Sequence, residues 1–98
     1  MEIKVTDRAL EWFQDEMFLE KGESVRFYAR YGGSSPLQEG FSLGMNKEEP
    51  MDPGVVQNKD GYTFFIEEHD LWYFKEHDLI VDYDEKMDEI AYRYEQGE

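Results

Sequence analysis

The stretch SVRFYARYGGSS, residues 24–35, carries the strongest signal for the fold. Apolar and polar residues alternate over residues 24–31, which is the period of a β-strand with one buried face. Arg26 and Arg30 then share the face opposite to the buried one. The pair Gly32-Gly33 predicts a tight turn that ends this strand.

The residues before this strand predict a short strand and one helix. Ile3-Lys4-Val5 is typical of a strand, and Thr6 is the expected helix N-cap. Gly22 is the expected C-cap. One apolar stripe recurs at helical spacing and consists of Ala9, Leu10, Phe13 and Met17.

The residues after the glycine turn predict short strands joined by hairpins. Pro36 keeps the loop 34–40 out of a central strand. Asp70 is the expected cap of a short helix over residues 71–74, and the tail 95–98 is expected to fray. The expected strands span residues 41–46, 55–57, 62–66, 79–83 and 87–94.

These elements predict a mainly β fold with two helices. We expect a small two-sheet β-sandwich or half-barrel, with the N-terminal helix packed against it and a second short helix. A length of 98 residues corresponds to one domain, residues 1–98. The aromatic content of 16% supplies large apolar side chains for its core.

The composition limits the partners. Ten basic and 24 acidic residues give a net charge of −14. This charge repels nucleic-acid phosphates and anionic lipids, and permits a basic protein or a divalent cation.

No apolar run is long enough to cross a bilayer, and Met1–Val5 lacks the features of a signal peptide. Without cysteine there is no thiol catalysis. We expect a cytoplasmic monomer or homodimer.

The order and spacing of these segments, from about Ile3 to Tyr83, resembles the HesB/IscA-like family of A-type iron–sulfur carriers. The resemblance implies the HesB-like fold over most of the chain. The segments that carry it are Ile3-Lys4-Val5-Thr6-Asp7-Arg8-Ala9, Val25 to Gly33, Phe65 to Leu71 and Leu79-Ile80-Val81-Asp82-Tyr83.

The ligand positions of that family are altered in this chain. Family members hold iron or iron–sulfur clusters with one cysteine in the glycine-rich turn and a Cys-x-Cys pair near the C-terminus. Here the first position falls on Ser34 or Ser35, and Asp88–Tyr94 contains no counterpart of the pair. A serine hydroxyl is a poor ligand for these clusters. The resemblance therefore implies a cysteine-free branch with no cluster and no other cofactor.

Two groups of residues suggest alternative chemistry. His69 and His77 are each flanked by carboxylates, and this donor set suits zinc, nickel or ferrous iron. Their eight-residue spacing matches no familiar ligand motif, so exposed histidines are the other interpretation. The turn at Ser34 and Ser35 offers hydroxyls and backbone N–H groups, as a small enzyme would require. However, the chain contains no Gly-x-Ser-x-Gly pattern.

The remaining candidates favour protein binding. Arg26 and Arg30 either hold an anionic group of a ligand or neutralise carboxylates of this chain. In the run Trp72-Tyr73-Phe74, one or two rings must face the core, which leaves one ring for a partner. We therefore expect a protein that is not an enzyme, binds a protein partner through Trp72, Arg26 and Arg30, and is linked to iron–sulfur or metal metabolism.

Overall fold

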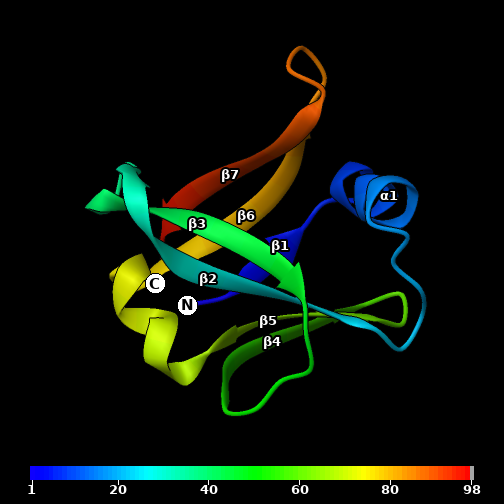
Figure 1. Cartoon of the computed structure of the whole chain (residues 1–98), viewed down its shortest axis with the longest axis horizontal. Helices are drawn as coiled ribbons and strands as arrows, with labels where there is room; N and C mark the ends of the chain where they lie inside the picture. Colours follow the sequence, from blue (N-terminus) through cyan, green and yellow to red (C-terminus); the bar gives the residue numbers. More distant parts are fainter. Residues whose placement is uncertain (98) are drawn as a thin grey trace.

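Residues 1–97, which a computed structural model describes, form seven strands and two helices (Figure 1). One sheet has the order β1-β6-β7 and consists of β1 (Ile3–Val5), β6 (His77–Asp84) and β7 (Glu89–Gln96). The other has the order β3-β2-β5-β4 and consists of β2 (Ser24–Ser34), β3 (Glu39–Lys47), β4 (Pro53–Lys59) and β5 (Tyr62–Glu67). The helices are α1 (Asp7–Glu16) and the 3-10 helix η1 (Glu68–Phe74). The predicted fold class is confirmed. Neither helix within residues 1–97 has the length and apolar character needed to span a membrane.

Two parallel strand pairs join segments that are far apart in the sequence. In the first sheet, β1 runs parallel to β6, with Ile3 opposite Leu79. In the second sheet, β2 runs parallel to β5, with Val25 opposite Phe64. The pairs β2–β3, β4–β5 and β6–β7 are antiparallel hairpins. Strand β4 lies at a sheet edge and begins at Pro53, a position where proline is tolerated.

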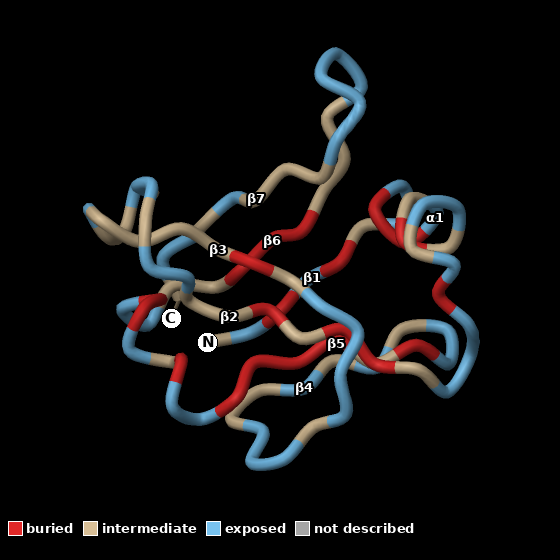
Figure 2. Tube along the Cα trace, viewed as in Figure 1, coloured by how far each residue is buried: buried red, intermediate tan, exposed pale blue. Residues whose placement is uncertain are grey.

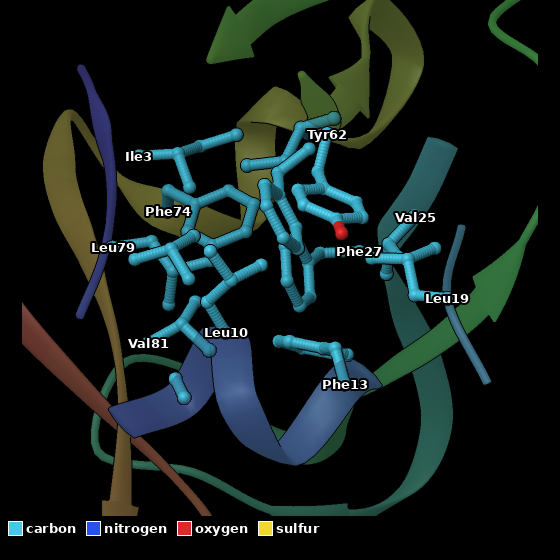
Figure 3. Packing of buried hydrophobic residues seen from close by; sticks show 14 of the residues in the cluster. Ile3, Leu10, Phe13, Leu19, Val25, Phe27, Tyr62, Phe74, Leu79 and Val81 are labelled. Carbon is cyan, nitrogen blue, oxygen red and sulfur yellow. The ribbon is translucent and has the colours of Figure 1, made fainter. Parts of the chain in front are cut away.

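The buried residues of both sheets and α1 form one hydrophobic core (Figures 2 and 3). At its centre, Phe13 of α1 lies 5.2 Å from Phe64 of β5, measured between ring centroids. Phe27 of β2 lies 6.2 Å from the Phe64 ring. All three side chains are fully buried. Rings at these separations add favourable aromatic contacts to the free energy of burial.

Thr6 begins α1 as predicted and also ties the helix to the first sheet. Its side-chain oxygen accepts a hydrogen bond from the Ala9 backbone N–H at 3.2 Å. The same hydroxyl donates to Asp82 Oδ1 at 2.9 Å. Asp82 Oδ1 also accepts from the Tyr83 backbone N–H, and Oδ2 accepts from Arg93 at 2.7 Å. The Arg93 bond, followed by those from Tyr83 and Thr6, lowers the pKa of Asp82 from 3.8 to about 2.

This carboxylate makes stability depend on pH in the acid range. Because the pKa of Asp82 is lower in the folded state, its ionised form stabilises the fold above about pH 4, and this contribution disappears as the pH falls toward 2. We expect the free energy of unfolding to decline over this interval, and the decline to be smaller in Asp82→Asn. Urea titrations at several pH values measure the effect. Asp15→Asn, at an exposed position of α1, should keep the wild-type decline.

Helix α1 ends at Glu16, so the predicted continuation to Gly22 is wrong. The Leu19 backbone N–H donates to the Phe13 carbonyl oxygen at 3.1 Å, which closes the last turn. Phe18 adopts a positive φ of 53° there, and Leu19 turns into the core while Phe18 stays 76% exposed. Burial of Leu19 therefore outweighs the cost of a left-handed conformation at Phe18. Gly22 instead lies in the turn before β2.

Most of the other expected elements also differ at their ends by one to three residues: β3, β4 and β6 extend beyond the expected ranges at both ends, β5 ends one residue later, η1 begins three residues earlier and β7 begins two residues later. Three differences are the most informative. Strand β2 continues through Gly32-Gly33 to Ser34, because β3 keeps pairing with it across an irregularity in register. Asp70 lies inside η1 rather than at its cap, since it forms an ion pair with Arg26. Strand β7 extends to Gln96, which pairs with His77. The frayed-tail prediction is therefore wrong for residues 95–96, and residue 98 lies outside the described residues.

Candidate functional site

Arg26 is the centre of a charged cluster that joins β2 to η1. Its Nη2 donates to Asp70 Oδ2 at 3.0 Å, and its Nη1 donates to Glu48 Oε1 at 3.3 Å. The Nη2 atom also lies 3.2 Å from Nε2 of His69. The Asp70 side chain is only 8% exposed, so the guanidinium neutralises a buried carboxylate. Of the two interpretations of Arg26, neutralisation of carboxylates of this chain is the one the contacts support.

Tyr28 packs against this guanidinium and fixes its position. The Arg26 Cζ atom lies 5.3 Å from the Tyr28 ring centroid. Gly44 of β3 leaves room for this ring, because a Cβ at Gly44 would lie 2.6 Å from the Tyr28 Cζ atom. Burial lowers the pKa of Arg26, but the hydrogen bonds that it donates to Asp70 and Glu48, together with the charges of these carboxylates, outweigh burial and raise the pKa above its ordinary value. Arg26 is thus a fixed positive charge that holds η1 against the second sheet.

Arg30 differs from Arg26 in its surroundings. It lies four residues further along β2, about 13 Å away at the usual rise of an extended strand. Its side chain is exposed, and among residues 1–97 it forms no ion pair. The structure therefore does not bring the two arginines together in one anion site, and Arg30 remains available to an external group.

The two histidines have separate local partners. His69 lies beside Arg26, with Nε2 3.6 Å from Asp70 Oδ2. His77 Nδ1 lies 3.0 Å from the Phe74 carbonyl oxygen and 3.1 Å from that of Lys75, so this nitrogen carries the proton and donates. Within the described part of the chain, no group of three or more His, Asp or Glu side chains is arranged to hold a metal ion. The metal-binding alternative thus gains no geometric support.

The serine turn is held together by its own hydrogen bonds. Ser35 Oγ accepts from the backbone N–H groups of Leu37 at 3.3 Å and Gln38 at 3.1 Å. Ser34 ends β2, eight residues after Arg26. Hydroxyl oxygens used in this way, in a chain without cysteine, do not fit an iron–sulfur cluster, which requires thiolates. No step through a cluster can be assigned to this turn.

Three aromatic rings form a continuous row where the β2–β3 hairpin meets η1. Tyr31 packs edge-to-face on Phe41 with ring centroids 5.7 Å apart, and Phe41 packs on Trp72 in the same way at 5.1 Å. Tyr31 is 87% exposed and Trp72 is 50% exposed, whereas Phe41 is half-buried against the core. We call Tyr31, Phe41 and Trp72 the aromatic strip.

The strip rests on buried tyrosines. Trp72 contacts Tyr73 at 6.2 Å between centroids, and the Tyr73 hydroxyl lies 2.9 Å from that of Tyr94. Burial raises the pKa of Tyr92 to about 12, and burial followed by the bond to Tyr73 raises the pKa of Tyr94 as well. The Tyr94 phenol therefore stays neutral, and the strip rests on uncharged groups at this point.

The sequence identified Trp72 but missed its neighbours. Strand periodicity places Tyr31 on the buried face of β2 together with Phe27, and Tyr31 is nevertheless exposed because β2 extends beyond the core. Phe41 lies beside Tyr31 because the two residues are partners in the antiparallel pairing of β2 and β3. The one available signal that β2 extends beyond the core was the position of Tyr31 directly before Gly32-Gly33.

Comparison with known proteins agrees with the sequence resemblance. Residues 1–96 match the family described as iron-sulphur cluster biosynthesis. The chain is 50% identical over 95 residues to a Bacillus subtilis (strain 168) protein named pyruvate dehydrogenase inhibitor. This alignment covers 97% of this chain and 100% of that relative. It is 40% identical to an uncharacterised protein of Staphylococcus saprophyticus and 41% identical to one of Staphylococcus haemolyticus. Each alignment spans 94% of this chain, with 97% and 96% of those relatives. No solved structure matches it. The HesB/IscA-like resemblance is confirmed, and this cysteine-free chain belongs to the iron-sulphur cluster biosynthesis family.

Proposed function

We propose that this protein is a non-catalytic regulator that binds pyruvate dehydrogenase and lowers its activity. The observation that carries the proposal is the 50% identity to the Bacillus subtilis protein named pyruvate dehydrogenase inhibitor, over the full length of that relative. Because the alignment runs through all the strands and both helices, the two proteins share the elements that would form a binding surface. The proposed site of action is the cytoplasm.

The side chains of this protein support action by binding rather than by catalysis. No thiol nucleophile exists in the sequence. The Ser35 hydroxyl accepts two backbone hydrogen bonds within its own turn, and His77 donates to carbonyl oxygens in the loop before β6. A nucleophile needs a base within hydrogen-bond reach, and among residues 1–97 no hydrogen bond joins Ser34 or Ser35 to a histidine.

Trp72 and Arg30 are the proposed contact residues, and Arg26 has a different role. Tryptophan and arginine are enriched among residues that dominate binding energy at protein interfaces. Trp72 is half-exposed and Arg30 is exposed, so a partner can reach both. Arg26 is engaged by Asp70 and Glu48, and therefore acts by positioning η1, which carries Trp72.

The test uses purified pyruvate dehydrogenase complex from Bacillus subtilis and steady-state assays of its NADH production. We expect the activity to fall as this protein is added and to level off once the binding sites are filled. Bovine serum albumin at equal concentration is the control for non-specific effects. Full activity at a large excess of this protein, together with no binding in sedimentation, would contradict the proposal.

A further inference from the structure

Within residues 1–97, the aromatic strip is the one place where two exposed aromatic rings, Tyr31 and Trp72, are joined through a third. The other large exposed apolar side chains in residues 1–97 lie on different elements: Phe18 after α1, Met51 before β4, Val56 in β4 and Met87 in the β6–β7 turn. Single exposed apolar residues are normal on protein surfaces, whereas contiguous patches mark interaction sites. Tyr31 and Trp72 are linked through Phe41 and anchored on the core, so they are already ordered before a partner binds.

We propose that the aromatic strip is the docking surface for the partner, and that the partner covers it with a basic protein segment whose Lys or Arg side chains lie over the rings. This inference rests on the proposed function for the identity of the partner and adds the contact surface and its chemistry. The segment supplies apolar stems that cover Phe41 and cationic groups that face Tyr31 and Trp72.

The net negative charge of the chain favours a basic segment over an acidic or neutral one. The whole chain carries a net charge of −14, which attracts a positively charged surface from a distance. Two residues before Phe41 in β3, Glu39 is exposed and forms no ion pair within residues 1–97. Aromatic rings close to an unpaired carboxylate such as Glu39 suit Lys or Arg side chains, because both the quadrupole of the ring and the carboxylate attract the cation.

The net negative charge of the chain and the aromatic strip act at different stages of binding. The acidic field extends beyond the surface, so it raises the association rate and is screened by salt. The strip acts only in contact, so it lowers the dissociation rate. Truncation of the strip should therefore change dissociation and leave the salt dependence of association as it is.

The experiment measures binding kinetics to immobilised Bacillus subtilis pyruvate dehydrogenase complex, at salt concentrations from about 50 to 300 mM. The double variant Tyr31→Ala/Trp72→Ala is compared with the wild type and with Phe18→Ala, which removes an exposed aromatic ring elsewhere. We expect the double variant to dissociate about 100-fold faster, since a hot-spot truncation weakens binding roughly tenfold or more. Its association rate should fall with salt as in the wild type, and Phe18→Ala should match the wild type. Circular dichroism melting confirms that all three proteins are folded.

Each failure identifies a different error. If the wild type binds and the double variant dissociates at the same rate, the strip is not the docking surface, although the proposed function stands. If the association rate rises with salt, the partner surface is acidic and the inference is overturned. If the wild type sediments as a dimer without the partner and the double variant as a monomer, a second copy of this chain covers the strip. If the wild type itself does not bind, the proposed function fails first.

Discussion

Phe64→Ala is expected to lower the free energy of unfolding by about 3–5 kcal/mol. The Phe64 side chain is fully buried and contacts the rings of Phe13 and Phe27, so its removal opens a cavity where α1, β2 and β5 meet. Small domains have a total stability of about 5–15 kcal/mol, so this single change removes a large part of it. Urea denaturation followed by circular dichroism measures the loss.

Two comparison variants separate cavity formation from loss of an aromatic ring as such. Phe64→Leu keeps much of the volume and should cost clearly less than Phe64→Ala. Tyr31→Ala removes a ring that is 87% exposed and should change the free energy of unfolding by about 0.5 kcal/mol or less. A loss below about 1 kcal/mol for Phe64→Ala would show that the three rings do not form the centre of the core.

Local patterns predicted the strands best where one face of the strand packs on the core. The alternation around Val25 and Phe27 reports burial directly, and both residues are fully buried. The parallel pairs β1–β6 and β2–β5 could not be predicted in this way, since the residues they join are distant in sequence and no local pattern records the partner. The end of α1 was missed for a related reason, because burial of Leu19 in the core overrides the glycine signal at Gly22.

The candidate site was predictable only in part. Trp72 stood out because three consecutive aromatic residues cannot all face one core. The roles of Arg26 and Asp70, which lie 44 residues apart in the sequence, depend on tertiary contact between β2 and η1. A carboxylate near a helix start is indistinguishable in sequence from a cap. Only the fold reveals that Asp70 faces a guanidinium.

The Arg26–Asp70 pair leads to the second large prediction. Arg26→Ala is expected to destabilise the protein by about 3–5 kcal/mol, because it leaves the buried Asp70 carboxylate without its cation. Arg26→Lys should lower the free energy of unfolding by less, because the ammonium keeps the positive charge beside Asp70. Some loss should remain, because an ammonium cannot contact Asp70 and Glu48 with the planar geometry of a guanidinium. Urea denaturation at neutral pH measures both variants.

The double variant Arg26→Met/Asp70→Leu tests the reason for this loss. If Arg26→Ala lowers the free energy of unfolding because the Asp70 carboxylate is left unpaired, removal of both charges should restore most of the stability. Well-packed apolar residues often replace a buried ion pair without net cost. A double variant as unstable as Arg26→Ala would instead mean that the Tyr28 stacking and the Glu48 contact of Arg26 dominate. In the first case η1 should stay docked, and the Trp72 emission spectrum in a Trp12→Phe background should remain that of the folded protein. The comparison of Arg26→Ala with the double variant thus decides whether Arg26 supports the aromatic strip by neutralising Asp70 or by its contacts with Tyr28 and Glu48.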